Sequence, residues 1–161
     1  MIILGIDPGY AIVGYGVIEF KSNRFSVVDY GAITTNAGTP FERRLELIYD
    51  DLNLLMGKFH PEAMSIEKLF YNTNAKTVID VAQARGVTVL AAKKNNIPIF
   101  EYTPLQVKQS VVGYGRAEKK QVQEMTRIIL KLAKIPKPDD TADALAMAIC
   151  HAHASGSLMG K

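Results

Sequence analysis

Three strand-like segments stand before the first helix, and this order is what most constrains the fold. Residues 1–9, 11–20 and 24–35 are each rich in β-branched and aromatic residues. The first segment ends in Asp-Pro-Gly, which is a turn signal. Only "KSN" separates the second segment from the third, so these two are predicted to pair as an antiparallel hairpin. The chain therefore begins as a sheet.

From Pro40 the hydrophobic pattern becomes helical. Apolar residues recur at steps of three and four, which is typical of one face of an amphipathic helix: Phe41, Leu45, Ile48, Leu52 and Leu55. The remaining segments predict strands at 62–70 and 97–102 and helices at 74–95, 104–112, 118–134 and 140–154. The order β-β-β-α-β-α-β-α-α-α indicates an α/β protein with a mixed five-stranded sheet flanked by helices.

The length of 161 residues corresponds to one domain. At that size roughly two-thirds of the unfolded surface can be buried, so a core can form without a partner domain. We expect one domain over residues 1–154. Residues 155–161 are expected to form a flexible C-terminal tail.

Composition excludes several classes of protein. The single cysteine, Cys150, rules out an internal disulfide and fits a reducing compartment. The start lacks the basic region and long apolar core of a signal peptide, and no apolar run approaches the ~20 residues of a membrane span. We expect a soluble cytoplasmic protein. The net charge of +3, from 19 basic and 16 acidic residues, favours anionic partners only weakly.

The segment 74–95 is apolar on two sides. One side carries Val78, Val81, Ala82 and Val89, and the other carries Ala75, Ile79, Gly86 and Leu90. A helix of this kind needs two surfaces to pack against. The sheet supplies one of them. Neighbouring helices or a second copy of the chain could supply the other.

Two carboxylates stand where strands are predicted to end. Asp7 lies near the C-terminal end of the first strand and Glu67 near that of the fourth. A charge there is costly unless it is paired or lies at the exposed end of a sheet. Asp7 could serve only as a turn former, and Glu67 could lie at a solvated strand end. Alternation along the strand places Glu67 on the same face as Ser65.

Three more carboxylates stand at the start of the last predicted helix. Asp140 and Asp143 are three positions apart, and thus share a helix face. Capping and the helix dipole, together worth ~1 kcal/mol, explain an aspartate at the helix start but not Asp143, which lies deeper among apolar residues. Pro136 and Pro138 hold the chain extended, so Asp139 is predicted to lie outside the helix.

These observations together favour function. If the first and fourth strands are neighbours, Asp7 and Glu67 meet, and a helix across that end adds Asp140 and Asp143. Two unit charges ~4 Å apart repel by ~4 kcal/mol at an effective dielectric of 20. Such a group must be protonated or neutralised by metal, and oxygen ligands suit Mg²⁺ or Mn²⁺. This is the composition of a two-metal site that cleaves phosphodiesters.

Five segments resemble one family in the expected order: "GIDPG", "SIEKLF", "QARG", "TPLQVKQSVVGYGRAEKKQV" and "DDTADALAMAICH". The chain is similar, over nearly its whole length, to the RuvC-type Holliday junction resolvases. The resemblance implies a ribonuclease H-like nuclease domain over residues 1–154. It also implies a homodimeric crossover junction endodeoxyribonuclease that resolves four-way DNA junctions in recombination and repair. Paired symmetric nicks would leave 5′-phosphate ends.

The resemblance also implies a metal site and partners. It places four catalytic, metal-binding acids on Asp7, Glu67, Asp140 and Asp143, where this chain has a carboxylate at every position. Two Mg²⁺ ions per subunit are implied, with Mn²⁺ as a substitute. The implied partners are four-way junction DNA and the branch-migration proteins RuvA and RuvB.

Three DNA-contacting positions follow from the same resemblance. Lys108 and Lys119 would contact DNA, with Lys119 also offsetting charge on the phosphate, and Phe70 would lie near unpaired junction bases. Without the resemblance the lysines read as solvated helix residues and Phe70 as a core residue. His151 and His153 are expected on the surface of the last helix.

Two other functions remain possible on the sequence. "GIDPG" also resembles the first phosphate loop of actin-like ATPases and sugar kinases, but those enzymes need a second lobe that 161 residues cannot supply. A junction-binding module without activity is the other alternative. The intact set of carboxylates argues against it.

Overall fold

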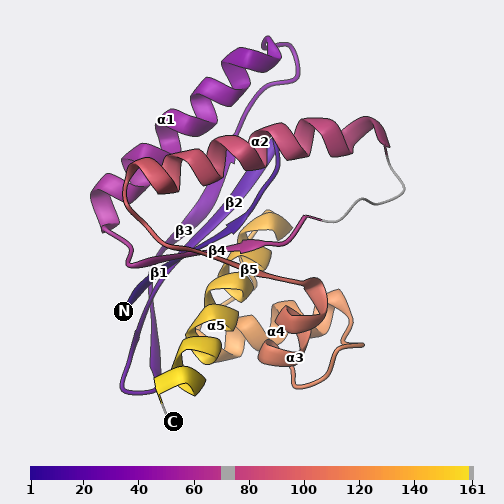
Figure 1. Cartoon of the computed structure of the whole chain (residues 1–161). Helices are drawn as coiled ribbons and strands as arrows, with labels where there is room; N and C mark the ends of the chain where they lie inside the picture. Colours follow the sequence, from indigo (N-terminus) through magenta and orange to yellow (C-terminus); the bar gives the residue numbers. More distant parts are fainter. Residues whose placement is uncertain (70–74, 160–161) are drawn as a thin grey trace.

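The computed structural model describes residues 1–69 and 75–159, which form five strands and five helices (Figure 1). The strands are β1 (Ile2–Asp7), β2 (Ile12–Lys21), β3 (Arg24–Thr34), β4 (Ala63–Glu67) and β5 (Ile99–Tyr102). The helices are α1 (Phe41–Phe59), α2 (Ala75–Lys94), α3 (Pro104–Val111), α4 (Lys119–Ile129) and α5 (Asp139–Met159). The predicted order of elements is confirmed.

Two helices, α5 and α4, differ from the prediction in their bounds. The helix α5 begins at Asp139, so the expectation that Asp139 lies outside the helix was wrong. It continues to Met159 rather than ending near residue 154, and residues 155–159 are helical. The helix α4 ends at Ile129, well before residue 134. Helix ends depend on packing and capping as much as on local pattern, which explains these differences.

The sheet is mixed, with strand order β3-β2-β1-β4-β5. The strand β2 pairs antiparallel with both β1 and β3, whereas β4 pairs in parallel with both β1 and β5. The hairpin between β2 and β3 turns at Ser22 and Asn23, both with positive φ. Two such residues make the turn whose twist suits a two-residue hairpin. Because β1, β4 and β5 are parallel, their carboxyl ends lie at the same end of the sheet.

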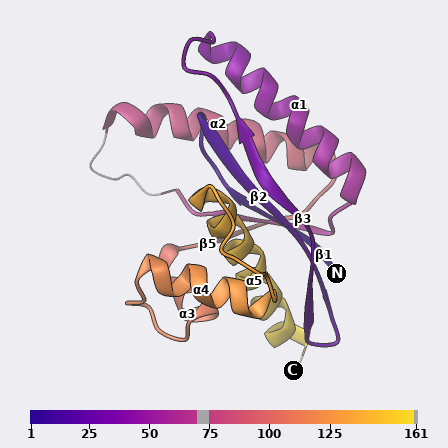
Figure 2. The ribbon, with the colours of Figure 1, turned by 180° about the vertical axis from the view of Figure 1, so that it is seen from behind.

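Helices cover both faces of the sheet. The helices α1 and α2 lie on one face, and α5 lies on the other with α3 and α4 beside it (Figures 1 and 2). Alternation along β1 sends Leu4 and Ile6 into the core beneath α1 and α2, and sends Ile3 into the core beneath α5. By the same alternation Asp7 points toward the α5 side.

The helix α5 packs unusually close to the sheet. Its buried face is rich in alanine: Ala142, Ala144, Ala146, Ala148 and Ala152 are each 0–1% exposed. On the sheet, Gly5 and Gly14 have no side chains to hold the helix away, and each faces a backbone atom of α5. The hydroxyl of Ser65 donates to the carbonyl of Met147 at 2.7 Å within this interface. Close packing sets the height of α5 above the strand ends.

None of the described helices combines the length and the apolar character needed to cross a membrane.

Candidate active site

The carboxyl ends of β1 and β4 bring Asp7 and Glu67 together. Ile6 pairs with Ile66 in the parallel register, and each acid is the next residue along its strand. Glu67 shares a face with Ser65, whose hydroxyl bonds to α5. The expectation that these two acids are neighbours is confirmed, and both lie on the α5 side of the sheet.

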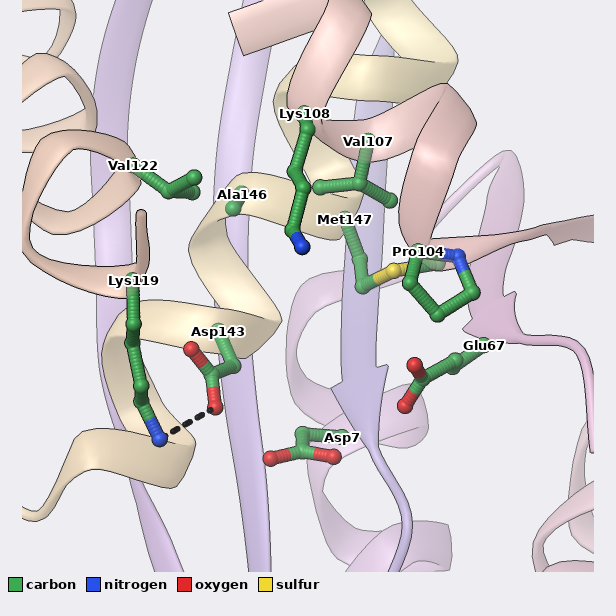
Figure 3. Close-up of a pocket in the computed structure, with 10 residues that line it drawn as sticks. All are labelled: Asp7, Glu67, Pro104, Val107, Lys108, Lys119, Val122, Asp143, Ala146 and Met147. Atoms are coloured by element: carbon green, nitrogen blue, oxygen red, sulfur yellow. Dashed lines mark ion pairs between the residues drawn. The ribbon is translucent and has the colours of Figure 1, made fainter. Parts of the chain in front are cut away.

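The first turns of α5 add the remaining carboxylates. Asp143 lines the same pocket as Asp7 and Glu67 (Figure 3). Asp140 is not among the residues that line it, but its carboxylate lies near enough to Asp7 to raise the pKa of that group. The structure thus brings all four predicted acids to one end of the sheet.

One open pocket holds three of these acids and two lysines (Figure 3). The carboxylates of Asp7, Glu67 and Asp143 point into it, and Lys108 and Lys119 reach it from α3 and α4. Its remaining wall is formed by Pro104, Val107, Val122, Ala146 and Met147. Hydrophobic periodicity alone does not mark these wall residues as part of a site; Pro104, after the helix-capping Thr103, gives a local signal for the start of α3.

The carboxylates raise one another's pKa. Burial, followed by the charges of Asp143, Asp140 and Glu67, raises the pKa of Asp7 to about 8. Burial and then Asp143 raise the pKa of Glu67. The pKa of Asp143 is also raised, chiefly by burial, while Lys119 opposes the shift. The site therefore holds more negative charge than its own cations balance, and it favours a bound positive charge.

Lys119 connects the pocket to the start of α5. Its Nζ lies 3.6 Å from carboxylate oxygens of both Asp143 and Asp139. Asp139 also pairs with Lys137 at 3.1 Å, and that hydrogen bond is the main cause of its lowered pKa. Asp139 thus faces the lysines rather than the other acids.

A capping box holds α3, which carries Lys108. The Thr103 hydroxyl accepts a hydrogen bond from the Gln106 backbone N–H at 3.1 Å, and the Gln106 side chain accepts one from the Thr103 N–H at 2.8 Å. These bonds satisfy backbone donors at the helix start. They fix where α3 begins and hence how Lys108 enters the pocket.

The donor atoms fit a divalent cation. Carboxylate oxygens without histidine or cysteine are the ligands that Mg²⁺ and Mn²⁺ prefer. Among residues 1–69 and 75–159, no three such side chains already stand close enough to hold an ion. The acids are near enough to raise one another's pKa but do not form a closed ligand set.

The expectations for the two histidines of α5 and for Phe70 have different outcomes. His153 is exposed as predicted, but His151 is only 4% exposed, so its predicted surface position was wrong. It lies between α5 and β5, where Tyr102 bonds to its Nδ1 at 2.7 Å. Phe70 falls outside the residues that the structure describes.

A family model and a curated relative with the same name both match this chain over most of its length. The family model described as "Crossover junction endodeoxyribonuclease RuvC" matches residues 3–151. A curated protein of that name from Ruminiclostridium cellulolyticum is 62% identical, with 99% of this chain and 98% of the relative covered.

Two solved structures from Thermus thermophilus are also similar. "Thermus thermophilus RuvC structure" has a TM-score of 0.91 at 32% identity, covering 98% of this chain and 96% of that one. The same protein "in complex with Holliday junction substrate" has a TM-score of 0.91 at 33% identity, covering 96% and 94%. The likeness therefore extends over the whole described fold.

Proposed function

Because the chain belongs to the RuvC family of crossover junction endodeoxyribonucleases, we propose that it resolves four-way DNA junctions by paired symmetric nicks. One observation carries this proposal. Asp7 and Glu67, from the ends of adjacent strands, share a pocket with Asp143 from α5 and with two lysines. A similar chain has a solved structure in complex with Holliday junction substrate. The nuclease function is assigned to residues 1–154.

The four acids are proposed to hold two divalent ions. Asp7, Glu67, Asp140 and Asp143 supply only carboxylate oxygens, and their mutual repulsion would be relieved by added positive charge. Mg²⁺ is the expected ion, and Mn²⁺ should replace it. Bound ions would supply an attacking water of lowered pKa and charge stabilisation at the leaving 3′ oxygen.

The lysines act on the phosphate. Lys119 now shares its charge between Asp143 and Asp139. If Asp143 is engaged by metal, the ammonium group can turn toward the scissile phosphate and offset the charge that develops there. Lys108 enters the pocket from α3 and is proposed to hold the DNA backbone. Phe70 is proposed to stack on unpaired bases at the junction centre.

A twofold dimer is proposed to form through α2. The face of α2 toward the core includes Ala84, Thr88 and Ala91, each 0% exposed. The opposite face leaves Ile79 61% and Leu90 52% exposed. This is the second apolar side predicted from the sequence. Two nicks on strands of like polarity require two sites related by a twofold axis, which such a dimer supplies.

The cellular setting follows from the family. We propose that the enzyme works in the cytoplasm together with the branch-migration proteins RuvA and RuvB. The products would carry 5′-phosphate and 3′-hydroxyl ends.

A cleavage assay with one variant tests the function. Labelled four-way junction should be nicked with Mg²⁺ and without ATP by the wild type. Asp7→Asn should bind junction as well as the wild type but lose nicking, since it removes a metal ligand without removing a phosphate contact. Binding without cleavage by the wild type would support a junction-binding module instead. Retained Mg²⁺-dependent cleavage by Asp7→Asn would contradict the assigned site.

A further inference from the structure

Arg85 reaches from α2 to the strand end that carries Glu67. Its Nε donates a hydrogen bond to the Glu67 carbonyl oxygen at 3.3 Å. Its Nη2 lies 3.4 Å from Oε1 of Glu101 on β5, and the side chain is only 15% exposed. One guanidinium group therefore connects a helix with the ends of two neighbouring strands.

The contact restrains the backbone beside Glu67. The Glu67 carbonyl and the Lys68 N–H belong to one planar peptide unit. The Lys68 N–H donates to the Tyr102 carbonyl at 2.9 Å, while Arg85 holds the carbonyl of the same unit. With both ends of this peptide held, rotation about the Cα–C bond of Glu67 is restricted. The direction in which its side chain leaves the strand is restricted with it.

Arg85 approaches from the face of the sheet opposite the pocket. Glu67 points toward α5, whereas Ile66 belongs to the core beneath α1 and α2. Glu101 pairs with Ile66 in the parallel register, and thus lies on the α2 side with Arg85. The guanidinium therefore acts on Glu67 through the backbone and does not touch the reacting groups.

Arg85 is not arranged for maximum stability. Its Nη2 is buried and lies within ion-pair distance of Glu101, yet it finds no well-directed hydrogen-bond acceptor in the part of the chain that the structure describes. Burying an incompletely bonded cation is costly. An apolar side chain would fill the space between α2 and the sheet without that cost. The presence of arginine at position 85 is better explained by its hydrogen bond to the Glu67 carbonyl oxygen.

We propose that Arg85 is a positioning residue that orients Glu67 for divalent-cation binding. The inference rests on the proposed function, because it assigns Glu67 to the metal site. Since Arg85 lies on α2, whose outer face is the proposed dimer surface, it also connects that surface to the active site. Residues that orient metal ligands typically change metal affinity about 10- to 100-fold when they are replaced.

The test compares two matched Arg→Lys variants. Arg85→Lys keeps a charge near Glu101, but a single ammonium group lacks the planar fork that spans Glu67 and Glu101. Arg127→Lys is the control, because Arg127 also pairs with a glutamate, Glu124, and donates to a backbone carbonyl, that of Leu132, away from the pocket. Calorimetric titration with Mn²⁺ should show affinity lowered by about tenfold or more in Arg85→Lys and unchanged in Arg127→Lys.

Cleavage at graded Mg²⁺ supplies the second measurement. Arg85→Lys should need about tenfold more Mg²⁺ for half-maximal cleavage while binding junction like the wild type. Equal Mn²⁺ affinity in the wild type, Arg85→Lys and Arg127→Lys would overturn the inference even if the wild type cuts junctions. A wild type that binds Mn²⁺ but cuts no junction would refute the function alone.

A second variant covers the possibility of misfolding. Arg85→Met removes the buried charge and retains most of the side-chain volume. It should fold, as judged by circular dichroism, and show the same loss of Mn²⁺ affinity as Arg85→Lys. Unfolding of both variants would show that Arg85 serves stability rather than positioning, and would overturn the proposal.

Discussion

A β-carbon on Gly14 would lie 2.0 Å from the carbonyl oxygen of Asp140. The strand β2 and the start of α5 thus meet backbone to backbone at the helix turn that carries the acids. We expect Gly14→Ala to push this turn outward, because a backbone atom cannot give way as a flexible side chain can. Cleavage should fall about tenfold or more, and stability should fall by about 1–3 kcal/mol, as measured by single-turnover assays and urea unfolding.

Gly57 supplies the control for this prediction. It lies within α1, where an added β-carbon would meet nothing within 4 Å. Gly57→Ala should raise stability by about 0.5–1 kcal/mol through helix propensity and leave cleavage unchanged. Wild-type cleavage by Gly14→Ala would show that the height of α5 above β2 is not critical.

The three aspartates at the start of α5 should differ in importance. Asp140→Asn and Asp143→Asn are each expected to abolish cleavage, because both carboxylates are proposed metal ligands. Both lie close enough to Asp7 to raise its pKa. Asp139→Asn should retain activity within about threefold, since Asp139 is 48% exposed and pairs with Lys119 and Lys137. Cleavage at saturating Mg²⁺ and equal junction occupancy tests all three. An inactive Asp139→Asn beside a fully active Asp140→Asn would reverse the assignment.

A charge on the exposed face of α2 should weaken the proposed dimer. Leu90→Glu should shift the protein toward monomer, because a buried unpaired carboxylate at a dimer interface costs several kcal/mol. Leu54→Glu is the matched control, since Leu54 is a more exposed leucine, at 71%, on α1. Sedimentation velocity at micromolar concentration should separate the two variants. A monomeric wild type would rule out the proposed dimer.

Because His151 is buried, it should lower the free energy of unfolding as the solution becomes mildly acidic. Burial lowers the pKa of this histidine in the folded state, whereas the unfolded value is about 6.5. The unfolded chain therefore binds the proton first as pH falls below that value, and the folded state loses stability. His151→Gln removes this contribution, so the variant should lose less stability than the wild type between about pH 7.5 and about pH 5.5.

The comparison must be made between wild type and variant. Asp7, Glu67 and Asp143 have raised pKa values, and so they favour the folded state as pH falls. Urea unfolding of both proteins at the two pH values isolates the histidine, because the carboxylates are common to both. The prediction is wrong if the stability difference between wild type and His151→Gln does not depend on pH.

Local pattern was sufficient for the order of the elements and for much of the site. Strand and helix periods are encoded within a few consecutive residues, so all ten elements were predicted in order. The same two-residue period places Glu67 on the same face of its strand as Ser65. The three-residue spacing of Asp140 and Asp143 likewise places them on one helix face.

Contacts between distant residues decided what the pattern could not. Periodicity showed two apolar faces on α2, but packing against α1 and the sheet determined that Ile79 and Leu90 face outward. His151 is buried because β5 supplies Tyr102 and Phe100 against it. Arg85 had no local signal that connected it with Glu67.

The position of α5 shows the physical reason most directly. The alanines of α5 allow a close approach, but nothing near residue 140 in the sequence indicates which strands the helix approaches. The distance between α5 and the sheet is set by glycines in β1 and β2 and by the hydrogen bond from Ser65 to Met147, 82 positions further along the chain. Side-chain type and spacing selected the acids, whereas close packing between remote segments brought them into one pocket.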